Sequence, residues 1–198
     1  IDLVDRVRGN FAGAIYEVQT GNLHLIRDRT GIFQIFWARA EGRIAFATSP
    51  KPLLELPWVS RELARDHLGE YLSFRVVHAP RTLLRDVHQL EPGHRLRFSE
   101  VAVRVQRYFR PTYAAPETPS PSDSDIIDAL HDTVERAVRR QLPDQTRVGV
   151  YLSGGVASTA IAAAARAASR ELDTFTVTFA EESYPEFPFA GRVAGILG

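Results

Sequence analysis

The sequence lacks cysteine and methionine entirely and has a single lysine, Lys51, among its 198 residues. The absence of cysteine excludes disulfides, thiolate zinc sites and a cysteine nucleophile within these residues. Methionine is missing even at position 1, and a chain that begins with Ile1 is expected to be a processed product or a piece of something longer. The six histidines show no metal-like spacing, so we expect surface or core roles for them.

An excess of charge of either sign is also missing. The 24 basic and 24 acidic side chains balance to a formal net charge of zero, which argues against a general nucleic-acid surface. No apolar run approaches a membrane span, and Ile1 to Val7 alternates apolar with charged residues, unlike a signal peptide. With 44% hydrophobic residues, the chain can form one large or two small globular domains. We therefore expect no nucleic-acid partner and no membrane partner.

The first part of the chain is predicted to be mostly β-structure. Apolar runs separated by turn residues such as Thr20-Gly21-Asn22 indicate a meander. The expected strands cover residues 11–18, 23–27, 32–40 and 43–47, with a later hairpin of 95–98 and 101–107. A helix is predicted to begin at Ser60, a good N-cap, with Glu62 in its first turn. The apolar face of that helix would consist of Leu63, Leu68, Tyr71 and Leu72.

A change of composition divides the chain at residues 111–124, which carry four prolines and little apolar mass. We predict domains at 1–112 and 125–198, joined by a linker at 113–124. The second domain should contain an amphipathic helix at 125–141, a strand at 147–152, an Ala-rich helix at 159–170 and a strand at 174–179. This order predicts a βαβ unit with a parallel sheet, whose ligand should lie at the C-terminal edge of the strands.

The segment Tyr151-Leu152-Ser153-Gly154-Gly155-Val156-Ala157-Ser158 joins the first of these strands to the Ala-rich helix. A strand, a Ser-Gly-Gly turn and a helix N-terminus favour anion binding, because consecutive N–H groups point inward and the helix dipole adds positive charge. Glycines also let the backbone approach phosphate oxygens. The segment is neither a Walker loop nor a dinucleotide fingerprint. A plain turn, with Ser158 only capping the helix, is the alternative.

Residues 153–158 resemble the pyrophosphate loop of the ATP pyrophosphatase superfamily, usually Ser-Gly-Gly-x-Asp-Ser, with Ala157 at the place of the Asp. In that superfamily the Asp helps to hold the magnesium ion bound to the ATP phosphates. A methyl group offers no oxygen ligand to a hard cation. The resemblance therefore implies an ATP site with weak or absent adenylation, and no metal ligand at position 157.

The whole chain resembles asparagine synthetase and its relatives through short segments in the same order. These are Arg8–Ala12, Arg27–Gly31, Phe46–Leu53, Leu90–His94, Arg107–Phe109 and Thr174–Phe179. In that family a glutamine-hydrolysing domain of the N-terminal-nucleophile class precedes an ATP-using synthetase domain. The resemblance implies an α+β and α/β fold: the C-terminal half of a β-rich glutaminase-like domain, then the start of a parallel-sheet adenine-nucleotide α-hydrolase-like domain. The nucleophilic cysteine would lie upstream of Ile1 and the later catalytic residues beyond Gly198, so none is expected here.

The resemblance also implies a reaction. A carboxylate attacks the α-phosphate of ATP, giving an acyl-adenylate and pyrophosphate, and ammonia from glutamine then displaces AMP to form an amide. The implied cofactors are ATP and Mg²⁺, and the implied partners are glutamine and aspartate or another carboxylate. A cytoplasmic location is expected, and homo-oligomerisation is left open.

Residue by residue, the resemblance places the β- and γ-phosphates of ATP against Ser153, Gly154, Gly155 and Ser158. Leu152 would lie near the adenosine and Val177 would border the adenine, although packing alone could explain both as buried strand residues. Glu186 would lie near the magnesium ion or the nucleotide, or be a solvated loop residue.

Two other interpretations stay open. β-Lactam synthetases and lasso-peptide cyclases resemble asparagine synthetase but close a ring amide within one substrate. A cysteine at the mature N-terminus, upstream of Ile1, would favour glutamine use over such ring closure. Because of Ala157, a nucleotide-binding or purely scaffolding pseudoenzyme is the third interpretation, and ATP binding without pyrophosphate release would favour it.

Overall fold

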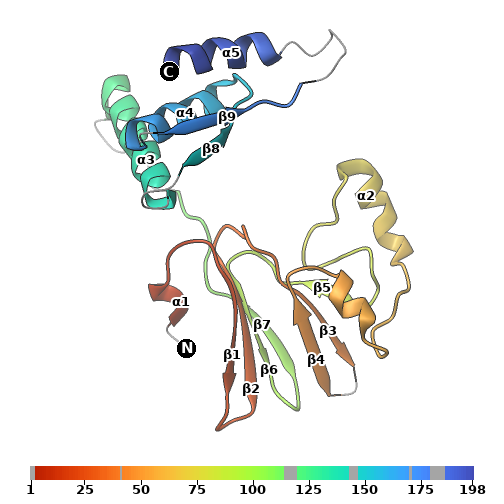
Figure 1. Ribbon diagram of the computed structural model, residues 1–198. Coiled ribbons are helices and arrows are strands. Elements are labelled where there is room, and N and C mark those ends of the chain that lie inside the picture. Colours follow the sequence, from red (N-terminus) through yellow and green to blue (C-terminus); the bar gives the residue numbers. More distant parts are fainter. Residues whose placement is uncertain (1–2, 41, 114–119, 143–146, 170, 179–185) are drawn as a thin grey trace. The chain divides into compact units, whose positions relative to one another are not determined.

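A computed structural model describes residues 3–40, 42–113, 120–142, 147–169, 171–178 and 186–198 (Figure 1). The chain divides into two compact units, residues 1–113 and 114–198. Among the described residues, the first unit contains two clusters of buried apolar side chains and the second contains one. Each unit is therefore described by itself.

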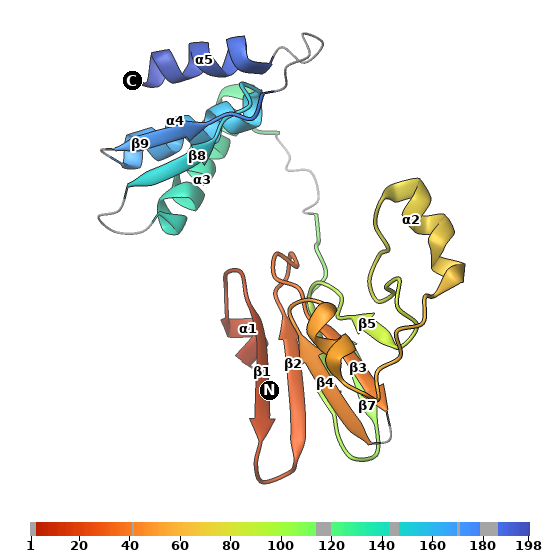
Figure 2. The same ribbon diagram turned by 45° about the vertical axis from the view of Figure 1, so that its right-hand side comes forward.

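The first unit is built on two antiparallel sheets (Figures 1 and 2). The four-stranded sheet has the order β1-β2-β6-β7, with β1 at Ala12–Glu17, β2 at Asn22–Arg27, β6 at His94–Phe98 and β7 at Val103–Arg107. The three-stranded sheet has the order β4-β3-β5, with β3 at Phe36–Ala40, β4 at Arg43–Ala47 and β5 at Val87–Gln89. The helical segments are α1 at Leu3–Arg6, η1 at Lys51–Glu55, η2 at Arg65–His67 and α2 at Leu68–Phe74.

Strand alternation gives the three-stranded sheet a core on each face. Trp37 and Ile44 pack with Leu25 and Leu96 of the four-stranded sheet, so the two sheets share one apolar layer. Phe36 and Ala38, which lie two residues apart on the same strand, face the other way. They join a second buried cluster that is completed by Leu53, Val59 and Val87. The β-rich nature expected of the first part of the chain is confirmed.

The turn after β2 is held by a buried carboxylate. Asp28 is fully buried, and its Oδ1 accepts hydrogen bonds from the N–H groups of Thr30 at 3.0 Å and Gly31 at 2.6 Å. Oδ2 accepts from the N–H of Phe33 at 3.2 Å. Burial alone would raise the pKa of Asp28, but these donors hold it below its usual value. The Arg-Asp-x-x-Gly segment is therefore a structural turn.

Two expectations for this unit are wrong. The strand expected at 32–40 begins only at Phe36, because the N–H groups of Ile32 and Phe33 bind the Asp28 carboxylate. No helix begins at Ser60. Its hydroxyl accepts from the N–H of Glu62 at 3.1 Å, a local turn that competes with helix formation. Leu63 instead forms an isolated antiparallel bridge with Leu84, and the α-helix starts at Leu68.

The second unit contains a βαβ arrangement. Its elements are α3 at Asp123–Gln141, β8 at Val148–Tyr151, α4 at Val156–Ala168, β9 at Leu172–Phe175 and α5 at Glu186–Leu197. Strands β8 and β9 pair in parallel, from Val148 opposite Leu172 to Tyr151 opposite Phe175, and lie side by side in Figures 1 and 2. The mixture of helices and strands is as expected, while the larger parallel-sheet domain stays a prediction.

The boundaries in this unit differ from the expected ones. Helix α3 begins at Asp123 rather than at Asp125, because Ser122 caps it in a reciprocal pair with Asp125. Helix α4 begins at Val156 rather than at Thr159. Strand β9 covers 172–175 rather than 174–179, so Val177 lies beyond the strand. Part of the expected linker, 114–119, lies outside the described residues.

Candidate functional site

The Ser-Gly-Gly segment lies where β8 ends and α4 begins. Leu152, the residue before the turn, is 1% exposed and packs in a core with Ala162 of α4 and Ala190 of α5. Its N–H donates to the carbonyl oxygen of Phe175 at 2.9 Å, which ties the turn to the end of β9. The turn therefore lies at the C-terminal edge of the parallel pair, where ligands of α/β sheets bind.

Gly154 is the residue that the local backbone requires. Its φ angle is +80°, in the left-handed region that side chains rarely adopt. A Cβ at this position would come within 2.6 Å of the Phe189 Cβ and 2.7 Å of the Ala190 nitrogen. The start of α5 therefore packs directly against the turn, and only glycine fits both the conformation and the space.

The hydroxyls of Ser153 and Ser158 close the turn on itself. Their Oγ atoms are 3.0 Å apart, and the Ser158 hydroxyl also donates to the carbonyl oxygen of Gly155 at 3.1 Å. The N–H of Gly155 approaches the Ser153 Oγ at 3.4 Å. This network brings together three of the predicted phosphate-binding residues and holds the turn in one conformation.

The first turn of α4 presents backbone N–H groups that a ligand could use. Gly155 is the N-cap, and no side chain caps this helix. The first intrahelical bond runs from the N–H of Thr159 to the Gly155 carbonyl at 3.0 Å, so the preceding N–H groups of Val156, Ala157 and Ser158 lack helical partners. There is no acidic residue in the first turn to neutralise the helix dipole. The geometry suits a phosphate group.

A magnesium ion does not fit the same residues. Ala157 lies in the first turn of α4 and contributes only a methyl group. Within the described part of the chain, no group of three or more His, Cys, Asp or Glu side chains is arranged to hold a metal ion. Glu186 begins α5, one helical turn before Ala190, and its side chain lies outside the described part of the structure. The carboxylate oxygens that a hard cation needs are thus missing from position 157 itself.

Two predicted adenosine contacts have different environments. The Leu152 side chain is buried in the core, so only its backbone could face a ligand. Val177 is 65% exposed, because the strand ends two residues earlier. Its side chain therefore does not have the packing role that a buried strand residue would have.

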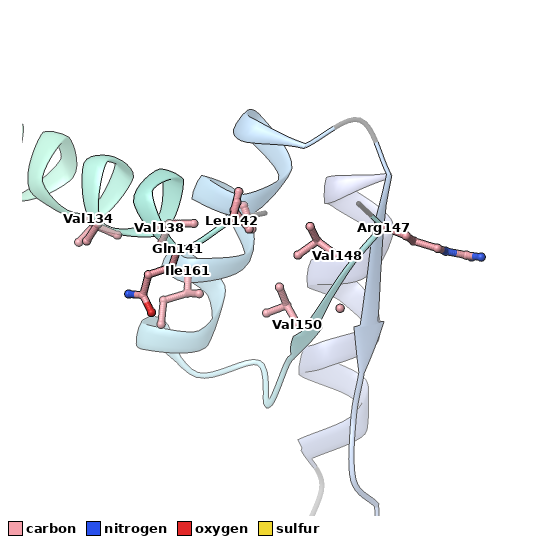
Figure 3. Close-up of a pocket in the computed structure, with 11 residues that line it drawn as sticks. Val134, Val138, Gln141, Leu142, Arg147, Val148, Val150 and Ile161 are labelled. Atoms are coloured by element: carbon pink, nitrogen blue, oxygen red, sulfur yellow. The ribbon is translucent and has the colours of Figure 1, made fainter. Parts of the chain in front are cut away.

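An apolar groove that the sequence did not predict lies between α3, α4 and β8 (Figure 3). Its volume is about 700 Å³, and valine, leucine, isoleucine and alanine side chains form most of its wall. Arg147 borders the groove, but Figure 3 shows its side chain directed away, and its Nε pairs with the Asp173 carboxylate at 2.6 Å. The groove is therefore unsuited to phosphate, and the loop remains the candidate site.

Comparison with known families decides the ancestry of the chain. Residues 1–109 match the glutamine amidotransferase domain, and residues 129–198 match asparagine synthase. The chain belongs to the glutamine amidotransferases of the asparagine synthetase type. The resemblance based on short segments is thereby confirmed, and the second match includes the whole candidate loop.

Individual relatives agree with this assignment. A putative glutamine-hydrolysing asparagine synthetase of Mycobacterium bovis is 35% identical over 100% of this chain and 31% of its own length. Glutamine-hydrolysing asparagine synthetase 1 of Bacillus subtilis is 28% identical, again over 100% of this chain and 31% of its own length. The chain thus spans only about a third of the length of these two relatives, 31% of each.

A solved structure, the glutamine phosphoribosylpyrophosphate amidotransferase of B. subtilis complexed with ADP and GMP, is 14% identical with a TM-score of 0.33. The matched region covers 87% of this chain and 33% of that structure's chain. A TM-score this low supports no conclusion about the fold or the function. No helix in the described parts of this amidotransferase chain is long and apolar enough to cross a membrane. The expected cytoplasmic location stays a prediction.

Proposed function

We propose that the chain belongs to an ATP-dependent amide-forming ligase, and that residues 153–158 bind the β- and γ-phosphates of ATP. The observation that carries this proposal is the turn at Gly154, which is followed directly by the uncapped N-terminus of α4. The asparagine synthase match over residues 129–198 supports it independently. Together they favour a phosphate site over a plain turn.

The proposed reaction has two steps. A substrate carboxylate oxygen attacks the α-phosphorus of ATP, the bond to the bridging oxygen of the β-phosphate breaks, and pyrophosphate leaves. The nitrogen of ammonia, derived from glutamine, then attacks the acyl carbon, and AMP leaves with the bonding electrons. Aspartate is the proposed carboxylate by analogy with the named relatives.

The role of this chain in that reaction is electrostatic. Negative charge accumulates on the pyrophosphate as the phosphorus–oxygen bond breaks. Fixed N–H donors from Val156, Ala157 and Ser158 would stabilise it without reorganising, which is the basis of oxyanion-type catalysis. The hydroxyls of Ser153 and Ser158 hold the turn before the ligand arrives. At this turn Ala157 offers magnesium no oxygen ligand.

The same alanine supports a second candidate, a nucleotide-binding pseudoenzyme. A metal contact that acts mainly in the transition state contributes to rate more than to ground-state affinity. Its loss would therefore leave ATP binding through the N–H groups while slowing adenylation. The ring-closing alternative stays open, because the cysteine at the mature N-terminus that would favour glutamine use would lie upstream of Ile1.

Calorimetric titration with ATP, together with an assay of pyrophosphate release in the presence of aspartate and glutamine, tests the proposal. Both candidates predict saturable ATP binding. Pyrophosphate release that depends on aspartate supports the ligase, whereas ATP binding without release supports the pseudoenzyme. Ser158→Ala should weaken ATP binding by about fivefold, the effect of one net hydrogen bond. Ser169→Ala, which removes a hydroxyl beyond the opposite end of α4, should leave the affinity unchanged. A wild-type chain that does not bind ATP at millimolar concentration would refute the phosphate site.

A further inference from the structure

The side chain of the residue that follows β9 reaches the backbone at the start of the loop. The Thr176 hydroxyl donates to the carbonyl oxygen of Leu152 at 2.7 Å. The strand pairing ends one residue earlier, at Tyr151 opposite Phe175, and the last backbone bond joins the Leu152 N–H to the Phe175 carbonyl. In a continuing parallel ladder, the Leu152 carbonyl would accept from the N–H of Val177. The Thr176 hydroxyl thus occupies the carbonyl oxygen of Leu152, which would otherwise accept the next hydrogen bond of the ladder, at the point where β9 ends.

This hydrogen bond sets the orientation of a peptide plane. The peptide bond between Leu152 and Ser153 is planar and its carbonyl and N–H point in opposite directions. With the Leu152 carbonyl directed at Thr176, the Ser153 N–H is directed away from β9. The next peptide plane joins Ser153 to Gly154. The φ angle of Gly154, +80°, then reverses the chain toward α4. The orientation of the first peptide therefore sets the direction in which the turn begins.

We propose that Thr176 is a positioning residue for the phosphate loop. Its hydroxyl fixes the first peptide of the turn, so that the N–H groups of residues 156–158 converge on one phosphate group. The ligands concerned are pyrophosphate and the terminal phosphates of a nucleoside triphosphate. This inference rests on the function proposed above and extends it to the residue that follows the neighbouring strand β9.

A merely structural role for Thr176 makes a different prediction. If the hydroxyl only stabilised the end of β9, its removal would lower the free energy of unfolding and affect all ligands of the folded protein equally. If it orients the loop, its removal weakens ligands that carry phosphates and leaves adenosine unaffected. Thr176 is half-buried and its neighbour Val177 is exposed, so the substitution disturbs little packing.

The test compares three variants of the whole chain by calorimetry with pyrophosphate, ATP and adenosine. Thr176→Val keeps the shape of the side chain and removes the donor. We expect it to weaken pyrophosphate and ATP binding by about fivefold, as for one orienting hydrogen bond, with adenosine binding unchanged. Thr176→Ser restores the donor and should recover most of the lost affinity. Thr174→Val makes the same chemical change two residues earlier in β9 and should match the wild type.

The outcomes separate the two proposals. If the wild type binds pyrophosphate and Thr176→Val binds it equally well, the positioning role is refuted while the phosphate site stands. If Thr176→Val weakens adenosine as much as pyrophosphate, or Thr176→Ser fails to recover affinity, the role is structural and the inference is also wrong. If the wild type binds neither pyrophosphate nor ATP, the phosphate site and the positioning role fall together.

Discussion

Gly154 and Ala190 are in contact across the candidate site, since a Cβ on Gly154 would come within 2.7 Å of the Ala190 backbone nitrogen. The contact joins the Ser-Gly-Gly turn to the first turns of α5. Backbone cannot move aside as the end of a flexible side chain can. The turn is therefore held from two sides, by α4 in sequence and by α5 in space.

Replacing Gly154 with alanine should disrupt the site and destabilise the second unit. The φ angle of +80° and the contact with α5 both oppose a Cβ. We expect a loss of about 1–3 kcal/mol in the free energy of unfolding, the usual range for backbone strain. Pyrophosphate affinity should fall at least tenfold. Urea denaturation and calorimetry measure the two effects.

Gly191→Ala is the matched control for that variant. Gly191 is the next residue of α5 after Ala190, and a Cβ there would meet nothing within 4 Å. Because alanine is the better helix former, this change should raise stability by about 0.5–1 kcal/mol. Equal destabilisation by both substitutions would contradict the close packing of Gly154 on α5.

Ala157→Asp should create a dependence on magnesium. The wild-type chain has no carboxylate at this position, so its ATP affinity should change little when Mg²⁺ replaces EDTA. In the variant, we expect ATP to bind about tenfold more tightly with Mg²⁺ than without it, because a hard cation prefers carboxylate oxygens. Calorimetry in the two buffers measures the ratio.

Ala157→Asn separates charge from size in the same experiment. The amide has nearly the shape of the carboxylate but no negative charge, so it should give much less of the gain. A wild-type chain whose ATP affinity already rises tenfold with Mg²⁺ would contradict the account, since other residues would then hold the ion.

The strands of the first unit could largely be predicted from alternation, and the errors have physical causes outside the local pattern. Residues 32 and 33 look like strand, but a buried carboxylate four or five residues earlier takes their N–H groups. The segment after Ser60 has helical periodicity, yet Ala64 and Glu62 exchange backbone bonds with residues 83 and 85. Pairings of that sequence separation cannot be read from a local window.

The candidate loop could be predicted because its chemistry is local. Glycines, hydroxyls and the following helix are consecutive, so the sequence alone places Ser153, Gly154, Gly155 and Ser158 in one turn. The contributions of Thr176 and Ala190 could not be predicted, because they depend on how β9 and α5 meet the loop. The apolar groove was missed for the same reason, since α3, α4 and β8 form it together.

Asp28→Asn should change the pH dependence of stability in the first unit. The folded-state pKa of Asp28 lies below its ordinary value of 3.8, so the ionised carboxylate stabilises the fold at higher pH. That stability is present above the unfolded-state pKa and is lost as pH falls through the folded-state pKa. At pH 7 the variant should lose about 2–3 kcal/mol, since hydrogen bonds to a charged group are weakened.

Urea denaturation from neutral pH down to pH 3 measures this effect, where the asparagine variant should show a shallower decline in stability than the wild type. Glu100→Gln removes a carboxylate that is exposed at the turn between β6 and β7, and it should keep the wild-type profile. Identical profiles for wild type and Asp28→Asn would show that the buried carboxylate does not stabilise the turn.

Ser122→Ala should weaken α3. The Ser122 hydroxyl caps the helix by accepting from the N–H of Asp125, whose carboxylate in turn accepts from the Ser122 N–H. Loss of such a cap costs about 1 kcal/mol. Ser124→Ala, inside the first turn of the same helix, should be neutral or slightly stabilising. Thermal unfolding of the two variants compares them, and equal midpoints would argue against the cap.

The central claim is that the N–H groups at the start of α4 bind phosphate, and a nitrogen–proton NMR titration of the chain with pyrophosphate tests it most directly. We predict saturable shifts of the amide signals of Gly155, Val156, Ala157 and Ser158, larger than those of any other segment of the second unit. The same titration of Gly154→Ala should give shifts at least tenfold weaker at equal pyrophosphate concentration, because the strained turn no longer presents its donors together. Unchanged signals for these four residues at saturating pyrophosphate, or shifts confined to other segments, would contradict the account.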